Sequence, residues 1–124
     1  MSNAVAHELV QKSLVGEALE HGPMAIFVAD EHGRYLAVNA YACDLLGYTR
    51  DELLDLRLTD VAVNPEARSD FDEMRRVGMR AGTVVLRHRD GSDLPMHYRA
   101  SETTVGGMPL YLGICWPVED SQPG

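Results

Sequence analysis

Glycine- and proline-containing breaks divide this 124-residue chain into short segments, and that division limits the folds open to it. Glycine takes backbone conformations that other residues avoid, and proline lacks an N–H group, so both end helices and strands or set turns. The segments between the breaks suit one helix of about five turns and several strands of ordinary length. The breaks fall at Gly22-Pro23, Gly33, Gly47, Asn64-Pro65, Gly82, Asp90-Gly91 and Gly106-Gly107.

Residues 5–21 are predicted to form an amphipathic helix that ends at Gly22-Pro23. Its apolar residues recur at spacings of three to five, which we interpret as one stripe along the helix. Such a stripe must be covered, either by the domain's own sheet or by a second copy of the chain. The stripe consists of Val5, Leu9, Val10, Leu14, Val15, Ala18 and Leu19.

Two apolar runs, residues 24–30 and 34–38, are predicted to pair as a β-hairpin around the turn at residues 30–33. The first run is apolar at both alternating sets of positions. We therefore expect both faces of this strand to be covered.

The middle third predicts short helices and then a longer one. Asn39 can cap a helix that stops at Gly47, and Thr49-Arg50-Asp51-Glu52 has the spacing of a capping box. One more turn is expected over residues 58–63. Asn64-Pro65 predicts the start of a helix that runs to about Ala81 and stops at Gly82. Its apolar face would carry Ala67, Phe71, Met74, Gly78 and Ala81.

The last third predicts three strands, over residues 83–89, 93–104 and 108–118, joined at Asp90-Gly91 and Gly106-Gly107. Pro95 is expected at an unpaired position or a bulge, because a central strand needs every N–H group.

This order of elements predicts an α+β domain, with a five-stranded antiparallel sheet and short helices on one face. The other face is the expected place for the N-terminal helix. The predicted division is a flanking helix over residues 1–21, one domain over residues 22–120 and a tail over residues 121–124.

The chain is acidic, with 11 Lys and Arg against 19 Asp and Glu and a net charge of −8. This balance argues against direct nucleic-acid binding. No apolar run reaches the ~18 residues of a membrane span, so we expect a cytoplasmic protein without a membrane partner. Cys43 and Cys115 are expected as reduced, buried thiols. Five arginines are interpreted as a solvated face, with a partner or anion surface as the alternative: Arg75, Arg76, Arg80, Arg87 and Arg89.

Several stretches, taken in order, resemble the PAS domain family. They are the strand–turn–strand of residues 25–39 that ends in Asn39, and the helix that closes on Leu46-Gly47-Tyr48 before Thr49-x-x-Glu52-Leu53. The hairpin over residues 87–92 and Tyr111-Leu-Gly-Ile114 complete the pattern. Each stretch is weak alone, but their order and spacing over about residues 22–118 resemble PAS domains closely.

The resemblance implies a regulatory domain and no enzyme. PAS domains are input modules of histidine kinases, cyclic-dinucleotide enzymes and transcription regulators. They sense through a pocket between the sheet and the short helices, and many pair through a flanking N-terminal helix. A homodimer and an output domain or partner protein are therefore implied, with an interface at Val5, Leu9, Val10, Leu14 and Ala18.

The residues that mark the cofactor-binding PAS subclasses are missing. Flavin photoreceptors need a cysteine in the region matching residues 56–60, and amide side chains where this chain has Leu86 and Met96. Haem-binding oxygen sensors place a histidine on the long helix, but residues 65–81 contain none. A haem site through His97 remains the alternative.

Other ligand chemistries also lack their residues in the sequence. Cys43 and Cys115 do not match the chromophore cysteine of the yellow photoreceptors, and their positions do not support a catalytic Cys–His pair. No metal-ligand spacing or phosphate-binding glycine loop is present. The cofactor therefore stays unassigned.

The pocket is expected to be apolar, and two alternatives remain for it. One is a packed core without a cavity, in a domain that acts as a ligand-free interaction and dimerisation module, and the other is a site for a small aromatic or fatty-acyl ligand. Tyr98, Thr59 or Arg99 would supply its polar group. The inward face of each strand depends on register, because a shift of one residue exchanges the two faces. The expected lining is Ile26, Val28, Leu36, Leu45, Leu53, Leu58, Val61, Phe71, Met74, Val85, Met96, Tyr98 and Ile114.

The end of the last strand departs from the family pattern. PAS domains commonly finish with Arg-Asp-Ile-Thr, which connects to an output linker, whereas this chain reads Cys115-Trp-Pro-Val-Glu-Asp120. Pro117 stops strand pairing, so we expect a different output connection on this side, or none. Three origins stay open for a chain that ends at Gly124: a piece of a longer sensor, a stand-alone PAS protein or an engineered product.

Overall fold

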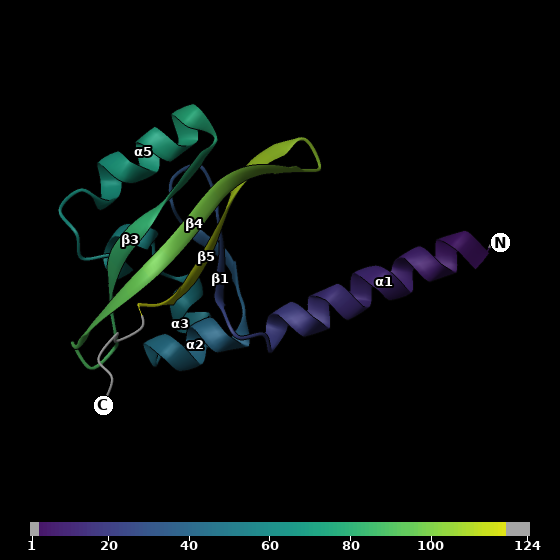
Figure 1. Cartoon of the computed structure of the whole chain (residues 1–124), viewed down its shortest axis with the longest axis horizontal. Coiled ribbons are helices and arrows are strands. Elements are labelled where there is room, and N and C mark those ends of the chain that lie inside the picture. Colours follow the sequence, from purple (N-terminus) through teal and green to yellow (C-terminus); the bar gives the residue numbers. More distant parts are fainter. Residues whose placement is uncertain (1–2, 119–124) are drawn as a thin grey trace.

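A five-stranded antiparallel sheet forms the centre of the computed structural model, which describes the backbone of residues 3–118 and the side chains of residues 7–118. The strands lie in the order β2-β1-β5-β4-β3, and the short helices lie on one side of them (Figure 1). This is the α+β architecture that the sequence predicted. The strands are β1 (Ala25–Ala29), β2 (Tyr35–Val38), β3 (Met79–Arg87), β4 (Asp93–Val105) and β5 (Met108–Pro117). The helices are α1 (Asn3–Glu20), α2 (Ala40–Leu46), α3 (Arg50–Leu54), α4 (Leu58–Val61) and α5 (Ala67–Val77).

Local capping chemistry fixes the short helices. Asn39 Oδ1 accepts a hydrogen bond from the Ala42 N–H at 3.0 Å, and Gly47 ends α2 with a φ of 78°. Thr49 and Glu52 form both hydrogen bonds of a capping box at the start of α3. These ends lie where the sequence placed them, because each cap depends on neighbouring residues only.

Helix α5 is shorter than predicted. It ends at Val77, because Gly78 takes a φ of 99° and donates its N–H to the Met74 carbonyl. The next residues, Met79 to Ala81, pair with Ser101 to Arg99 of β4 instead of continuing the helix. The predicted helix over residues 78–81 is therefore wrong, and Gly82 lies inside β3.

Pro95 lies in a regular part of β4, opposite Val85 and without a bulge. Its carbonyl accepts from the Val118 N–H at 3.1 Å, just beyond Pro117, where the ladder between β4 and β5 ends. The proline nitrogen therefore falls at the end of the ladder and interrupts no pair.

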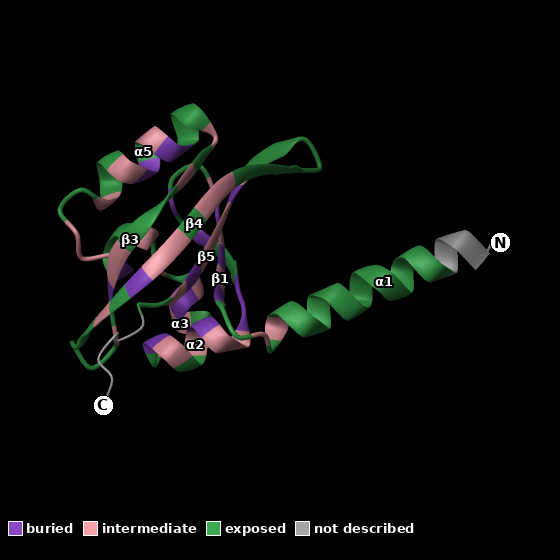
Figure 2. Ribbon diagram, viewed as in Figure 1, coloured by how far each residue is buried: buried purple, intermediate pink, exposed green. Residues whose placement is uncertain are grey.

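Helix α1 projects away from the sheet and does not cover it (Figure 1). Its described side chains are exposed up to Leu19 (Figure 2), including Leu9 at 62% and Leu14 at 58%. The expectation that α1 covers its own sheet is wrong. The outer sides of Ile26 and Val28 are consequently half-exposed, and β1 is fully buried on one face only.

The apolar residues of α1 do not form a single stripe. Leu9, Leu14 and Leu19 are five residues apart, and five residues turn the helix by about 140°. These three leucines therefore point in three directions around the axis. Val10, Leu14 and Ala18 share one row at four-residue spacing, whereas Leu9 lies outside that row.

The inner face of the sheet carries two separate groups of buried side chains. The larger group joins β1, β2, α2, α3, α4 and the ends of β3, β4 and β5. The smaller group consists of Phe71, Met74 and Tyr111, which fix α5 against β5. Leu58 of α4 contacts both groups, so a gap between them is the natural place for a cavity.

Candidate functional site

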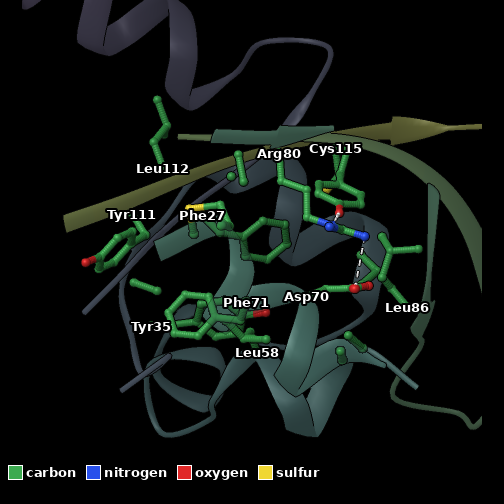
Figure 3. Close-up of a pocket in the computed structure, with 18 residues that line it drawn as sticks. Phe27, Tyr35, Leu58, Asp70, Phe71, Arg80, Leu86, Tyr111, Leu112 and Cys115 are labelled. Atoms are coloured by element: carbon green, nitrogen blue, oxygen red, sulfur yellow. Dashed lines mark hydrogen bonds and ion pairs between the residues drawn. The ribbon is translucent and has the colours of Figure 1, made fainter. Parts of the chain in front are cut away.

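A mostly apolar pocket lies between the inner face of the sheet and the helices α4 and α5 (Figure 3). The cavity has a volume of about 140 Å³. Phe27 of β1 and Tyr35 of β2 line it from the sheet, and Leu58 of α4 lines it from the helices together with Phe71 and Met74 of α5. The remaining lining residues are Ala29, Ala62, Ala67, Asp70, Arg80, Val84, Leu86, Tyr98, Ala100, Tyr111, Leu112, Gly113 and Cys115.

Strand register determines which side chains reach the pocket. In β1 the buried positions are Ala25, Phe27 and Ala29, and Phe27 lies opposite Gly113 of β5. Gly113 has no side chain, so it leaves room in front of the Phe27 ring. Residues opposite one another in antiparallel strands point to the same face, which brings Tyr98 of β4 beside Cys115.

The pocket has one polar end, formed by three residues from three elements. Arg80 Nε of β3 donates to the Tyr98 hydroxyl at 2.8 Å, and Arg80 Nη2 lies 3.0 Å from Asp70 Oδ1 of α5. Figure 3 shows the Arg80 guanidinium directed at Asp70. The Arg80 and Asp70 side chains are 37% and 36% exposed, so this end is the mouth of the pocket. The hydrogen bond to Tyr98 raises the pKa of Arg80, which therefore stays cationic.

Aromatic rings form the other end of the pocket. Phe71 and Tyr111 meet edge to face, with ring centroids 5.5 Å apart and planes at 76°. Arg75 of α5 places its guanidinium 5.9 Å from the Phe71 ring centroid and 5.8 Å from that of Tyr111. Its hydrogen bond with Tyr111 raises the pKa of Arg75. This arginine covers the rings from outside and does not line the cavity.

Two ionisable groups in the wall are kept neutral by burial. Desolvation raises the pKa of the Cys115 thiol to about 12. Burial also raises the pKa of the Tyr35 hydroxyl far above its ordinary value. Neither group ionises near neutral pH, so Cys115 is an unreactive wall residue. Cys43 is only half-buried, unlike the buried thiol that the sequence predicted.

Of the thirteen lining residues predicted from the sequence, four line this pocket: Leu58, Phe71, Met74 and Tyr98. Leu53, Val61 and Met96 are instead fully packed in the larger core, and Leu45 packs against its edge. These positions are inward-facing but lie away from the cavity.

The strand positions predicted to face inward were wrong by one residue in most cases. Phe27, Val84 and Cys115 face the pocket in place of Ile26, Val85 and Ile114. In the same way, Ala29 lines the pocket in place of Val28, and Tyr35 in place of Leu36. Both faces of these strands are apolar, so alternation in the sequence could not indicate which face is inward.

The sequence predicted little of the polar end of the pocket. Tyr98 was proposed as a polar group, whereas Thr59 is exposed on α4 and Arg99 is exposed beside Ile114 on the outer face. Arg80 was assigned to a solvated arginine face, but it lines the pocket. The sequence signal that would have found it is Gly78, because a helix stop there places Arg80 in β3.

Among the residues that the structure describes, no group of three His, Cys, Asp or Glu side chains is placed to hold a metal ion. Of the helices within residues 3–118, none has the length and apolar character needed to cross a bilayer.

The family model described as PAS domain matches residues 23–115. A PAS domain from a two-component sensor histidine kinase shares the fold with a TM-score of 0.79 at 17% identity, covering 90% of this chain and 99% of that one. The PAS domain of an HTR-like protein from Haloarcula marismortui also has a TM-score of 0.79, at 22% identity, covering 94% and 100%. A domain of the sensory box sensor histidine kinase/response regulator from Geobacter sulfurreducens has a TM-score of 0.72 at 28% identity, covering 86% and 93%. No curated protein sequence matches the chain.

The family model spans most of the chain, and the structure reproduces the corresponding fold. The chain therefore belongs to the PAS domain family. It is a PAS sensory domain, similar to the sensor domains of histidine kinases. PAS domains are typically sensory modules without catalytic activity.

Proposed function

We propose that this PAS domain detects a small, mostly apolar organic molecule in the pocket beneath α5 and pairs with a second copy of itself through α1. One observation carries the ligand-binding part: the 140 Å³ cavity lies among aromatic and aliphatic side chains. Well-packed cores hold few voids larger than a water molecule. An apolar cavity of this kind is suited to bind an organic ligand.

Toluene titration tests this part directly. A ligand at 100 times its dissociation constant raises the free energy of unfolding by about 2.7 kcal/mol. In urea denaturation experiments we expect the free energy of unfolding to rise with the logarithm of the toluene concentration once that concentration exceeds the dissociation constant. Native mass spectrometry of freshly purified protein, beside a denatured control, would reveal a copurified natural ligand by its extra mass.

The variant Ala100→Leu is the matched control. Ala100 lines the cavity from β4, and three additional carbon atoms there would occupy ligand space. We expect this variant to fold and to show no response to toluene. A wild-type protein that toluene and benzene leave unchanged at saturating concentration would contradict the ligand-binding proposal.

The pairing part is supported by two uncovered apolar surfaces on one chain. The first is the row of Val10, Leu14 and Ala18 on α1, in which Val10 and Leu14 are 54% and 58% exposed. The second is the outer face of β1 and β5, where Ile26, Val28, Ile114 and Trp116 are half-exposed. A second copy supplies a helix for the sheet and a sheet for the helix, and it thereby covers both surfaces.

A hollow of about 160 Å³ lies where these surfaces meet, between the last turn of α1 and the outer side of β1 and β2. Gly16, Leu19, Ile26 and Val28 are among its lining residues. It gives an apolar side chain from a second α1 a place to insert at the junction.

Light scattering of the full chain tests the pairing. We expect a dimer, which Leu14→Asp converts to a monomer, because a carboxylate cannot be buried unpaired. Ser13→Asp introduces the same charge on an exposed neighbouring position and should leave the dimer intact. A monomeric wild-type chain at millimolar concentration would contradict the pairing proposal and leave the ligand proposal standing.

A further inference from the structure

The polar end of the pocket narrows the chemical class of ligand. We propose that the pocket selects an uncharged single-ring aromatic molecule with one hydroxyl group, a ligand of the phenol class. This inference rests on the proposed ligand-binding function. The ring lies among Phe27, Phe71 and Tyr111, and the hydroxyl group faces Arg80, Tyr98 and Asp70.

The volume sets the size of the ligand. An engineered apolar protein cavity of about 150 Å³ holds one benzene molecule, whereas sites for drug-sized ligands measure about 300–1,000 Å³. At about 140 Å³ the pocket admits one six-membered ring with a small substituent.

The walls favour a ring over an acyl chain. Five aromatic side chains line the cavity, and four of them form two pairs: Phe71 with Tyr111, and Phe27 with Tyr35 at a centroid distance of 5.1 Å. Aromatic rings attract one another in edge-to-face and offset arrangements, an interaction that an acyl chain cannot make. Ala100 and Gly113 lie on the sheet side and leave a flat floor under the ring.

The charges at the mouth exclude an ionised ligand. Arg80 is already paired with Asp70 at 3.0 Å, so the polar end carries no net charge. A carboxylate ligand that approached Arg80 would also approach the Asp70 carboxylate, and an ammonium ligand would approach the guanidinium. Moving either ion from water into an apolar cavity adds a desolvation cost.

A hydroxyl group matches all three residues at once. It can donate to the second carboxylate oxygen of Asp70 and accept from the Tyr98 hydroxyl or from a guanidinium N–H of Arg80. Arg80 Nε is hydrogen-bonded to the Tyr98 hydroxyl, and Arg80 Nη2 is paired with Asp70 Oδ1. These two interactions fix the direction of the guanidinium N–H groups that are left for a ligand. The pocket therefore offers one donor and one acceptor position beside an aromatic cage.

Three probes of nearly equal ring size separate the possibilities: phenol, toluene and benzoate. Each would be titrated into the full chain by isothermal calorimetry at neutral pH, with saturation-transfer NMR for weak binding. We expect phenol to bind about tenfold more tightly than toluene, the factor that one additional hydrogen bond supplies. Benzoate should bind more weakly than toluene.

Two variants test the roles of the polar residues. Tyr98→Phe keeps the ring and should lower phenol affinity more than toluene affinity, which removes most of the phenol preference. Tyr48→Phe, a tyrosine outside the pocket, is its control. Asp70→Asn keeps the shape but frees the charge of Arg80, so it should gain benzoate binding by about tenfold. A role of Asp70 in stability alone would not produce that gain.

The outcomes separate this inference from the proposed function. Toluene binding as tight as phenol binding, or benzoate as the tightest of the three, would overturn the phenol class and leave the apolar pocket intact. Failure of all three probes to bind would overturn both proposals.

Discussion

Asn39 Nδ2 donates a hydrogen bond to the Leu19 carbonyl oxygen at 2.6 Å, and so ties the last turn of α1 to the start of α2. The same amide group donates to the Met24 carbonyl at 2.9 Å, and its oxygen accepts from the N–H groups of Ile26 and Ala42. One buried side chain thus joins α1, β1 and α2. Through it, β1, which carries Phe27 into the pocket, is connected by hydrogen bonds to the end of α1.

Replacing Asn39 should therefore be costly. Asn39→Ala removes a helix cap and leaves backbone groups of Leu19, Met24 and Ile26 without their partner. We therefore expect the free energy of unfolding to fall by about 2–4 kcal/mol. Asn64→Ala is the control, because Asn64 accepts one backbone hydrogen bond, from the Val85 N–H at 2.7 Å. Its loss should be about 1 kcal/mol. Urea denaturation of both variants measures the difference, and equal losses would contradict the junction role.

Gly47 allows His88 to pack against the end of α2. Its φ is 78°, and a Cβ atom there would lie 2.5 Å from His88 Cε1. Gly47→Ala should lower the free energy of unfolding by about 1–2 kcal/mol because of the left-handed backbone, and by about as much again because the new methyl group clashes with His88.

A double variant separates these two terms. His88→Ala in the Gly47→Ala background should recover the clash term only. Gly91→Ala, with a φ of 93° and open space around the new methyl group, should show the backbone term alone. Similar losses at Gly47 and Gly91 would show that the His88 contact is unimportant.

The register of β1 gives a prediction that distinguishes two adjacent residues. Phe27 is 6% exposed and faces the pocket, whereas Ile26 faces outward. Phe27→Ala should cost about 3–5 kcal/mol, and Ile26→Ala less than half of that. Thermal or urea unfolding of the two variants measures this ratio, and a larger loss at Ile26 would mean the opposite register.

The two thiols should differ in reactivity. Burial raises the pKa of Cys115 to about 12, and its side chain lies in the pocket wall. Burial also raises the pKa of the half-buried Cys43, which is nevertheless nearer to solvent. At pH 8 we expect a disulfide reagent to modify Cys43 at least about tenfold faster than Cys115. The variants Cys43→Ser and Cys115→Ser show which thiol reacts in the fast phase and which in the slow phase of the modification. Faster modification of Cys115 would contradict its burial.

Acid should destabilise the fold through carboxylates that are hydrogen-bonded in the native state. The hydrogen bond from Arg50 lowers the pKa of Glu20, and the Thr49 N–H lowers that of Glu52. A carboxyl pKa below its unfolded value adds stability above that value, and the stability disappears as the pH falls through the folded pKa.

We therefore expect the free energy of unfolding to be steady from pH 7 to pH 5 and to fall below about pH 4.5. Denaturation at a series of pH values measures this, and Glu20→Gln should flatten part of the decline. The exposed-site control Glu102→Gln should not. A stability that increases below pH 4.5 would contradict this account.

Much of the fold could be predicted because its boundaries are local. The Asn39 cap, the Thr49–Glu52 capping box and Gly47 each act through residues within a few positions. The end of α5 was harder, because the sequence predicted a helix with Gly78 on its apolar face and a stop at Gly82. The helix stops at Gly78 because Met79 to Ala81 pair with β4, a strand that is distant in the sequence.

The site was less predictable. The errors concern which face of a strand or helix a residue lies on, and the composition of a segment does not determine that face. In β1, Ile26, Phe27 and Val28 are all apolar, so alternation could not assign the inner face. In α1, spacings of three to five residues looked regular, although five-residue steps distribute the leucines around the axis. The ion pair of Asp70 with Arg80 joins two elements whose contact depends on where β3 begins.

The separation of the buried side chains into two groups has a consequence for the motion of α5. The smaller group, Phe71, Met74 and Tyr111, contacts the larger one only at its edge, and Val63 and Asn64 fix the chain before α5 to Val85. We therefore expect α5 to open locally at a lower free energy than the rest of the domain. If the proposed ligand binds, it contacts both groups, and amide hydrogen exchange in α5 should slow as the pocket fills. The signal would then be a change in the local opening of α5, with the average shape of the domain preserved.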